Sequence, residues 1–273
     1  MLTLHSISYK TLFTTLLDEV NLSLHAGEVV ALCGCNGAGK STLLKIMAGS
    51  LLPSQGQVLL NGLPLSQWSP QQLARQRAVL PQSSSLHFSF SVFEVVMLGR
   101  FPHGGGNHCA ADREVVQQAL ALFDVEHLAR RDVTTLSGGE TCRVHLARVY
   151  AQITPASSTQ DAALMTPRFL LLDEPTAALD IAHQHRVLQQ IQALTQHKLG
   201  VLLIVHDLNL AAQYADRMIM LKQGRVRHSG PTQALMTPAV IEECLGFQSI
   251  ITPHPISQHP VMLPLTQGRT IAC

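Results

Sequence analysis

A glycine-rich stretch, Gly34–Thr42, restricts the fold of this chain more than any other segment. It follows a short apolar run, Val29–Cys33, and precedes a second one, Leu43–Ala48, that Gly49 can end. An apolar strand, a glycine loop with G-x-x-x-x-G-K-S spacing and a helix are together typical of a phosphate-binding loop. The stretch therefore predicts a nucleotide site at the start of an α/β unit.

The residue types in this loop suit an anionic ligand. Glycines let main-chain N–H groups close around phosphate oxygens, and the following helix adds unsatisfied N–H groups and the positive end of its dipole. We expect the Lys40 ammonium to reach the β- and γ-phosphates and the Ser41 hydroxyl to hold Mg²⁺. The predicted nucleotide-binding residues of the loop are Gly34, Cys35, Asn36, Gly37, Ala38, Gly39, Lys40, Ser41 and Thr42.

Composition narrows the class of protein. The 273 residues suffice for one large domain or two small ones, and a net charge of +1 without a basic block argues against electrostatic binding of nucleic acid. The six cysteines form no C-x-x-C pair, which is typical of free thiols in a reducing cytosol. The N-terminus does not have the order of a signal peptide, and no apolar run is long enough to cross a bilayer. We expect a soluble, cytosolic chain, or one peripheral to something else.

Further strands complete the expected sheet. Apolar residues alternate loosely over 2–7 and 20–24, which predicts antiparallel strands ahead of the phosphate loop. Short apolar runs at 78–81, 169–172 and 200–205 predict buried strands. Polar residues follow these runs, and the carboxyl ends of strands in an open α/β sheet face the ligand crevice. The residues in question are Gln82, Asp173, Glu174 and His206.

A helical pattern separates two of these strands. It begins near Leu86 and is broken by an expected flexible loop at 102–107, and it predicts a helical subdomain at about 86–150. Within it, Ser137 and two glycines open a helix, which fits either a second anion site or an ordinary N-cap. We expect a surface loop or a partly disordered insertion at 152–167, two short helices at 231–247 and an irregular chain beyond Thr252.

The polar residues at the strand ends fit nucleoside triphosphate hydrolysis. Phosphoryl transfer needs positioning and positive charge near the developing oxyanions, which Lys40, Ser41 and Mg²⁺ would supply. Asp173 is expected to hold Mg²⁺ through its water shell. Glu174 would then act as general base on the attacking water, with His206 near the γ-phosphate.

At this level of detail the chain resembles the ATP-binding-cassette (ABC) ATPases over residues 1–247, followed by a tail at 248–273. Seven motifs stand in the order found in that family. They are Tyr9 as the adenine-stacking aromatic, Gly34–Thr42 as Walker A, Gln82 as the Q-loop glutamine, Leu136–Glu140 as the signature, Phe169–Glu174 as Walker B, Ala178–Asp180 as the D-loop and His206 as the switch histidine.

The resemblance implies an α/β fold of the P-loop type, with a mixed central sheet, an N-terminal antiparallel β-subdomain and an inserted α-helical subdomain. It implies ATP and Mg²⁺ as ligands, with Gln82 sensing Mg²⁺ and the γ-phosphate beside a membrane permease. It also implies a two-fold dimer in which Ser137, Gly138 and Gly139 of one copy close on the ATP held by Lys40 of the other, next to Asp180.

The stretch Met97–His103 is similar to one found in importer ATPases of the iron-chelate and vitamin B12 group. Further similarity to haem importers implies haem uptake through a separate permease dimer at the cytoplasmic face of the bacterial inner membrane, served indirectly by a substrate-binding protein. Ferric siderophores and corrinoids are alternative cargoes. Cassettes of DNA repair or translation and a non-catalytic regulatory module are more remote alternatives, because the chain has a single cassette and retains Lys40, Glu174 and His206.

Several residues depart from the family pattern. Cys35 replaces the usual proline, Thr141 and Cys142 replace two glutamines, and Ala177 replaces a serine. Cys35 is either a reactive thiol at a helix N-terminus or simply tolerated there. The tail histidines His254 and His259 are either haem ligands or solvated side chains.

Overall fold

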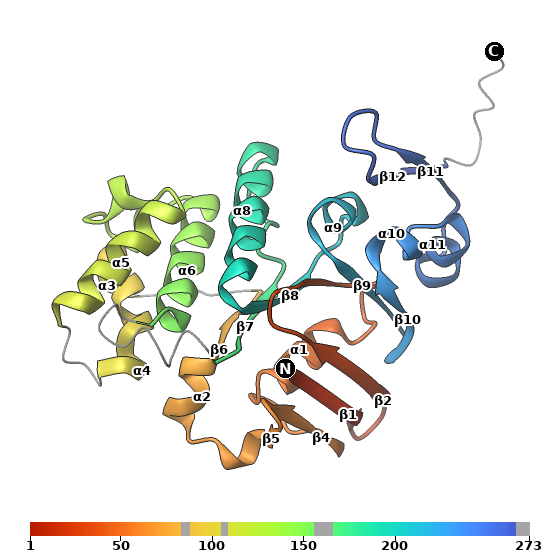
Figure 1. The fold of residues 1–273 in the computed structure, drawn as a ribbon, viewed down its shortest axis with the longest axis horizontal. Helices are drawn as coiled ribbons and strands as arrows, with labels where there is room; N and C mark the ends of the chain where they lie inside the picture. The colour runs from red at the N-terminus through yellow and green to blue at the C-terminus, as the bar shows by residue number, and fades with distance from the viewer. Residues whose placement is uncertain (83–87, 105–108, 156–165, 266–273) are drawn as a thin grey trace.

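The core of the chain is a six-stranded sheet, seen here in a computed structural model that describes residues 1–82, 88–104, 109–155 and 166–265 (Figure 1). Its strands run in the order β10-β9-β3-β8-β7-β6, all parallel to their neighbours except β10 at the edge. Their bounds are β3 (Val29–Cys33), β6 (Arg77–Leu80), β7 (Arg168–Asp173), β8 (Leu199–Ile204), β9 (Arg217–Lys222) and β10 (Arg225–Pro231). The predicted mixed central sheet is confirmed.

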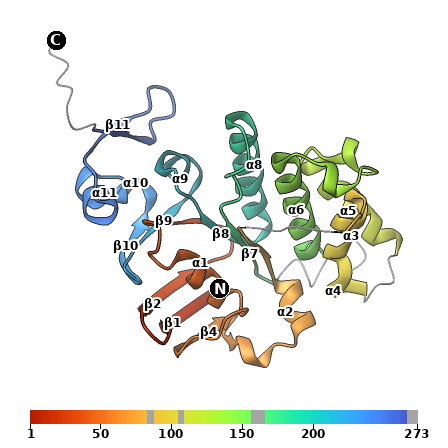
Figure 2. The same ribbon diagram turned by 180° about the vertical axis from the view of Figure 1, so that it is seen from behind.

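Both faces of this sheet are covered, which explains why its central strands β3, β7 and β8 are buried along their whole length and largely apolar. In β3, Ala31 packs on one side and Leu32 on the other, into two separate clusters of buried side chains. The first face carries α6 (Gly138–Ile153), α8 (Ile181–Leu194) and α9 (Leu208–Tyr214). The second face carries α1 (Lys40–Met47) and a further small sheet (Figures 1 and 2).

The small sheet is the predicted antiparallel β-subdomain. Its strand order is β2-β1-β4-β5, with bounds β1 (Leu2–Lys10), β2 (Thr15–Leu24), β4 (Gln55–Leu60) and β5 (Leu63–Pro64). Helix α1 lies between the small and central sheets, because its buried face (Leu43, Leu44, Ile46 and Met47) packs into their shared core. The start of α1 is therefore held firmly beside the ends of the central strands.

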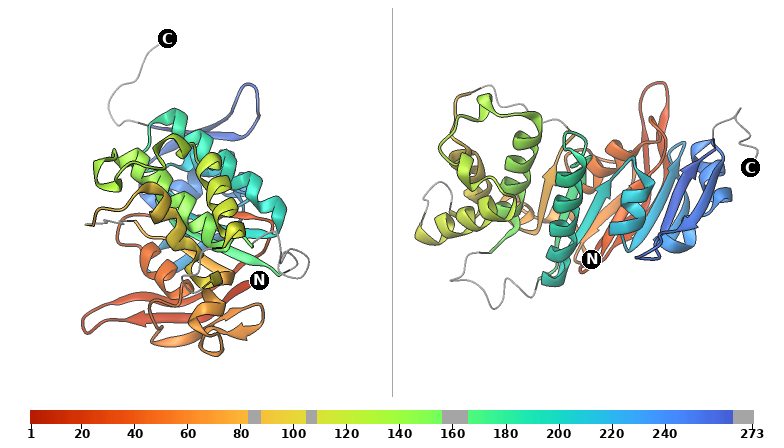
Figure 3. Two further views of the ribbon diagram at one scale, coloured as in Figure 1. Left: turned by 90° about the vertical axis from the view of Figure 1, so that its left-hand side faces the viewer. Right: turned by 90° about the horizontal axis from the view of Figure 1, so that it is seen from above.

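A group of helices stands beside the central sheet, as the views from the side and from above show (Figure 3). It contains α3 (Val92–Met97), α4 (Phe101–Gly104), α5 (Ala110–Leu122) and α6. Ser91 and Ser137 start α3 and α6 with capping boxes completed by Glu94 and Glu140. The inserted helical subdomain expected from the sequence is confirmed. The expected flexible loop at 102–107 is wrong for 102–104, which belong to α4; residues 105–108 lie outside the described residues.

The remaining helices connect these layers. They are α2 (Pro70–Gln76), α10 (Thr232–Leu235) and α11 (Pro238–Leu245), with short 3₁₀ turns at 65–67, 98–100, 126–128, 133–135 and 195–197. Helices α10 and α11 confirm the prediction of two short helices at 231–247. Most of the expected surface loop at 152–167 lies outside the described residues. Among the residues that the structure describes, no helix combines the length and apolar character needed to span a bilayer.

The expectation of an irregular chain beyond Thr252 is wrong. Strands β11 (Ser249–Pro253) and β12 (Pro260–Pro264) pair as an antiparallel hairpin. Pro253 and Pro260 face each other at the turn, so neither interrupts the interior of the ladder. Asn209 of α9 anchors the hairpin by accepting from Met262 N (2.7 Å) and donating to Met262 O (3.2 Å). This anchor is a long-range contact, which the local proline pattern does not reveal.

Candidate functional site

The phosphate loop crosses from β3 to α1 with Lys40 at its centre. Lys40 is buried, and its Nζ donates to the main-chain oxygens of Gly34 (2.7 Å) and Cys35 (3.0 Å). Gly34 lies at φ +152°, and a Cβ there would come within 2.2 Å of Leu221 O, so the loop requires glycine at this position. The loop therefore encloses a fixed positive charge, as a phosphate site needs.

The start of α1 is open to a ligand. Gly39 precedes it in a left-handed conformation (φ +103°), and no side chain of the described residues caps the helix there. The first N–H groups of a helix have no acceptor within the helix, and they favour an anion. The predicted anion-binding geometry is present at this helix end.

A cleft of about 270 Å³ lies over this loop. It brings together side chains from the phosphate loop, from the end of β6 and from the ends of β7 and β8. The lining residues are Leu16, Asn36, Gly37, Ala38, Gly39, Lys40, Ser41, Thr42, Gln82, Glu174 and His206. Ten of the residues proposed from the sequence thus meet in a single cleft.

Asp173 ends β7 at the base of this region. It is 5% exposed, and its Oδ1 has no hydrogen-bond partner among the described residues. Burial raises the pKa of its carboxyl group, while a hydrogen bond with Ser41 acts in the opposite direction. A buried carboxylate with an unsatisfied oxygen beside Ser41 fits a cation ligand.

Glu174 and His206 both line the cleft and contact each other. His206 Nε2 lies 2.6 Å from Glu174 Oε1, a hydrogen-bond distance. Glu174 has φ +52°, a left-handed conformation that costs on the order of 1 kcal/mol for a residue with a Cβ. Such strained residues cluster at functional sites. The contact joins the ends of two adjacent strands, β7 and β8, at one point.

Tyr9 and Cys35 do not line the cleft. Tyr9 is half-buried opposite Leu17 in the β1–β2 pairing, and Leu16 of the same hairpin lines the cleft instead. The Cys35 main chain belongs to the loop, but its thiol contacts the main-chain oxygens of Cys244 (3.5 Å) and Leu245 (3.8 Å). No signal in the sequence distinguished Leu16, which is one of several apolar residues in its strand.

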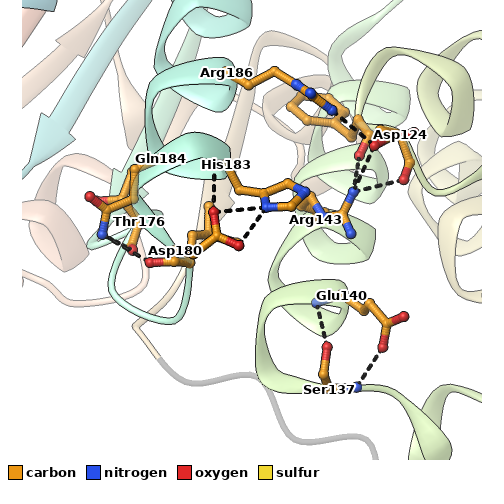
Figure 4. Close-up of polar contacts among 11 residues, drawn as sticks. Asp124, Ser137, Glu140, Arg143, Thr176, Asp180, His183, Gln184 and Arg186 are labelled. Carbon is orange, nitrogen blue, oxygen red and sulfur yellow. Dashed lines mark hydrogen bonds and ion pairs between the residues drawn. The ribbon is translucent and has the colours of Figure 1, made fainter.

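The signature residues lie apart from the cleft of their own chain. Ser137 Oγ accepts from Glu140 N (3.2 Å), and Glu140 Oε2 accepts from Ser137 N (2.7 Å), as Figure 4 shows. A Cβ on Gly139 would come within 3.2 Å of Ala178 O, so the start of α6 packs on the D-loop of the same chain. Gly138 lines a separate pocket that also contains Gln82, Asp173 and Glu174.

Asp180 also lies outside the cleft. Its carboxylate accepts from His183 N (2.9 Å) and contacts His183 Nδ1 (2.8 and 2.9 Å; Figure 4). These hydrogen bonds, with the main-chain amide contributing most, hold the pKa of Asp180 below its usual value. His183 was not identified from the sequence, although its position three residues after an N-cap aspartate is a recognisable signal.

The contacts of His254 and His259 in the β11–β12 hairpin bear on whether these side chains are haem ligands or solvated side chains. The His254 and His259 rings stack with centroids 4.8 Å apart, and each Nδ1 contacts Ser257 Oγ (2.9 and 2.7 Å). Both rings thus have a structural role in closing the hairpin turn. This arrangement supports the alternative in which they are not haem ligands.

Replacing Asp173 with asparagine is expected to raise the melting temperature of the nucleotide-free chain by about 2–4 °C, equivalent to ~1 kcal/mol. Burial raises the pKa of Asp173 in the folded state, so the folded chain binds this proton more tightly than the unfolded chain. The charged form therefore lowers the stability at pH above the folded pKa, and the neutral amide avoids that cost. Differential scanning calorimetry with and without Mg-ATP measures the change, and stabilisation by Mg-ATP should be lost.

Asp132→Asn is the matched control with the opposite sign. Hydrogen bonds from Ser89 and Thr134 hold the pKa of Asp132 below its usual value, so its charged form stabilises the folded chain at neutral pH. Its neutralisation should lower the melting temperature and preserve the effect of Mg-ATP. A lower melting temperature for nucleotide-free Asp173→Asn would contradict the assigned cost of burying the charge.

The fold and the cleft together define a nucleotide-binding cassette with a phosphate loop, a buried acidic strand end and a carboxylate–histidine pair. Residues 17–156 match the ABC transporter family, and the chain belongs to this family. The ATP-binding subunits of ABC transporters bind and hydrolyse ATP, and this chain is an ATPase of that kind.

Relatives of known name span nearly the whole chain. It is 47% identical over 250 residues to the hemin import ATP-binding protein HmuV of Gloeobacter violaceus, covering 92% of this chain and 89% of the relative. It is 45% identical over 263 residues to the protein of the same name from Pseudomonas entomophila, covering 96% and 99%.

Solved structures agree on the fold. A putative metal-chelate type ABC transporter in an inward-facing conformation matches with a TM-score of 0.79 at 26% identity, covering 97% of this chain and 98% of that one. A dimeric ATP-binding cassette in a post-hydrolysis state with ADP and Pi matches with a TM-score of 0.71 at 25% identity, covering 85% and 99%.

Proposed function

We propose that this chain is the ATPase subunit of an importer that couples ATP binding and hydrolysis to the uptake of haem through a separate permease. The observation that carries the proposal is the identity of 45–47% to hemin import ATP-binding proteins over more than nine-tenths of the chain. The assembled phosphate cleft supports the catalytic part, and the names of the relatives support the cargo.

Within the cleft, Lys40 and the N–H groups of 36–42 would hold the β- and γ-phosphates. Mg²⁺ would be held by Ser41, Gln82 and Asp173, and when bound it supplies positive charge that offsets the charge developing on the phosphates. The unsatisfied Oδ1 of Asp173 supports this assignment. Among the described residues, no group of three or more His, Cys, Asp or Glu side chains is arranged to hold a metal alone, which fits an ion that depends on nucleotide phosphates.

Glu174 is the proposed general base. A carboxylate at the edge of the cleft can accept a proton from the attacking water, and His206 orients that carboxylate through the 2.6 Å contact. Gln82 also lines the cleft, where it would contact Mg²⁺ and sense the γ-phosphate. Tyr9 remains the proposed adenine-stacking aromatic, with Leu16 beside the nucleotide.

A second copy of the chain would complete each site. Ser137, Gly138 and Gly139 are absent from the lining of the cleft in their own chain, yet they form an exposed helix start suited to phosphate. A two-fold dimer pairs each such helix start with the phosphate loop of the other copy, with Asp180 near the contact. The dimeric cassette among the solved relatives supports this arrangement.

The permease is proposed to dock on the helical subdomain. Three large apolar side chains are exposed there: Phe88 (73%), Phe101 (64%) and Leu98 (48%). Leu98 and Phe101 lie three residues apart in the chain, and exposed large apolar side chains that gather on one surface are typical of a protein–protein contact. The stretch similar to iron-chelate importers, Met97–His103, contains two of the three.

Polar contacts tie this surface to the nucleotide core. Arg75 of α2 donates to Pro102 O (2.8 Å), and His103 Nε2 contacts Gln152 O of α6 (2.8 Å). Gln152 Nε2 in turn donates to Arg77 O (3.2 Å) at the start of β6, the strand that leads to Gln82. Movement of the proposed docking surface would therefore reach both α6 and the Gln82 end of the cleft.

We further propose the boundaries 1–247 for the ATPase domain, about 86–150 for its helical subdomain and 248–273 for a C-terminal extension that includes the hairpin. The chain would act at the cytoplasmic face of the bacterial inner membrane. A substrate-binding protein on the far side would deliver the cargo to the permease without touching this chain. Its closest contacts would be a second copy and the permease dimer.

The cargo is tested with the full complex in membranes. We expect haem, presented with its binding protein, to raise ATP turnover several-fold above the basal rate, because cargo delivery drives closure of the ATPase dimer. A ferric siderophore and a corrinoid, presented in the same way, should leave the rate within about twofold of basal. The measurement is phosphate release in proteoliposomes.

A metal-chelate cargo is the second candidate, because the transporter with a TM-score of 0.79 is described as metal-chelate type. Stimulation by the siderophore and not by haem would favour that cargo. The matched control is the complex carrying Glu174→Gln, in which none of the three cargoes should stimulate phosphate release. Basal turnover without response to any of the three would contradict both cargo proposals and leave the ATPase assignment intact.

A further inference from the structure

The thiol of Cys35, in the phosphate loop, lies next to a second cysteine. Cys35 Sγ is 3.5 Å from the main-chain oxygen of Cys244, which belongs to the last turn of α11. Both thiols are free, Cys35 is exposed and Cys244 is buried. We propose that a peroxide oxidises Cys35 and Cys244 to a disulfide, and that this bond prevents ATP binding at the phosphate loop.

Covalent geometry brings the pair within reach. A cysteine sulfur lies about 2.8 Å from its own α-carbon and a carbonyl oxygen about 2.4 Å from its own. With the 3.5 Å contact between Cys35 Sγ and Cys244 O, the two α-carbons are at most ~9 Å apart and closer for any bent path. A disulfide spans about 4.4–6.8 Å between α-carbons. Where the α-carbons lie further apart than this span, the bond requires the backbone at Cys35 to move towards the last turn of α11, which ends at Gly246 (φ +77°).

The other described cysteines do not compete for this bond. Cys33 belongs to β3 and packs into the buried cluster beneath the sheet, and burial raises the pKa of its thiol to about 12. Cys109 and Cys142 lie on α5 and α6, where their sulfur atoms contact Asp112 and Pro175 O. Cys35 is thus paired by position with Cys244.

The oxidation balances with a peroxide as the oxidant. Cys35 loses its thiol proton, and the thiolate attacks one oxygen of the peroxide and breaks the O–O bond, which gives a sulfenic acid on Cys35 and a hydroxide that takes up that proton as water. The Cys244 thiolate then attacks the Cys35 sulfur, which forms the S–S bond and displaces a second hydroxide, and this hydroxide takes up the thiol proton of Cys244 as a second water. The two sulfurs lose two electrons, and the peroxide gains them. Burial, Glu243 and Cys35 raise the pKa of Cys244, and Lys222 and Arg227 offset part of this rise.

The bond would disable the loop through Lys40. The main-chain oxygen of Cys35 accepts from both Lys40 Nζ (3.0 Å) and Ala38 N (3.1 Å). Moving Cys35 towards α11 therefore moves the groups that shape the phosphate cradle. This inference depends on nucleotide binding at the loop and not on the identity of the cargo.

The test treats the full chain with hydrogen peroxide, blocks the remaining thiols with N-ethylmaleimide and maps peptides without reduction. We expect a linked peptide pair containing Cys35 and Cys244, and at least a tenfold loss of affinity for a fluorescent ATP analogue. Dithiothreitol should reverse both changes. Prior addition of Mg-ATP should slow the formation of the linked pair, because the ligand holds the loop in place.

Two variants complete the test. Cys244→Ser should keep the basal ATPase activity, form no linked pair and lose less than about threefold of its ATP affinity on peroxide treatment. Cys109→Ser removes another exposed thiol and should behave as the unmodified sequence does. The proposal is overturned if peroxide yields no linked pair, or if Cys244→Ser loses as much affinity as the parent, since Cys35 would then act alone.

Discussion

Replacing Glu174 with glutamine is expected to lower kcat for ATP hydrolysis by about 10²–10⁴-fold while leaving ATP binding intact. Glutamine has nearly the same shape, and its amide oxygen can still accept from His206 Nε2 at the position of Glu174 Oε1, which lies 2.6 Å away. It cannot take a proton from the attacking water at neutral pH. The variant should therefore accumulate as an ATP-bound dimer, which light scattering and phosphate release measure together.

Glu114→Gln is the matched control for this substitution. Glu114 is exposed on α5 and lies outside the cleft, and its carboxylate accepts a 3.4 Å hydrogen bond from Gln118 of the same helix. Its turnover should stay within about twofold of the parent, because Glu114 lies outside the cleft. The substitution should also leave the fold intact, since surface substitutions usually change the free energy of unfolding by less than about 0.5 kcal/mol. Near-normal turnover of Glu174→Gln would remove Glu174 as the base and assign proton transfer elsewhere.

The parts of this site that the sequence predicted are those encoded locally. The phosphate loop, its flanking strand and its helix depend on nine consecutive residues with strong conformational preferences, so the sequence predicts that Lys40 and Ser41 begin a helix, as they do in the structure. Asp173, Glu174 and His206 lie at strand ends in the structure, as predicted, because each follows an apolar run that is long enough for one buried strand. Parallel strands then bring their carboxyl ends to one edge.

The features that the sequence did not predict depend on contacts between distant segments. The C-terminal hairpin is held by Asn209, more than fifty residues earlier, and nothing near its prolines signals that partner. The position of Leu16 in the cleft depends on how the β1–β2 hairpin meets the phosphate loop. Helix α2 is different, because Ser69 and Gln72 form a capping box around Pro70 at the first helical position, and sequence inspection can identify both signals.

A mixture of two inactive variants tests whether the site is shared between copies. Lys40→Ala removes the ammonium that spans the phosphate loop, and should weaken ATP binding by about 10–100-fold, the value of a charge-assisted hydrogen bond. Gly138→Glu adds a negative charge at the start of α6. Its Cβ would meet only the Ala178 Cβ at 3.7 Å, and an acidic residue suits the first turn of a helix, so the variant should fold.

With Glu174→Gln in both chains to stop turnover, each variant alone should retain essentially no ATP after gel filtration. The mixed dimer should retain about one nucleotide, because one of its two composite sites combines an intact phosphate loop with an intact signature. If Lys40 and Gly138 served a site within a single chain, every chain in the mixture would be defective, and no nucleotide would be retained. The parent carrying only Glu174→Gln, with about two nucleotides per dimer, sets the upper limit. Retention by the mixture therefore reports directly whether the start of α6 in one copy binds the phosphates held by the other.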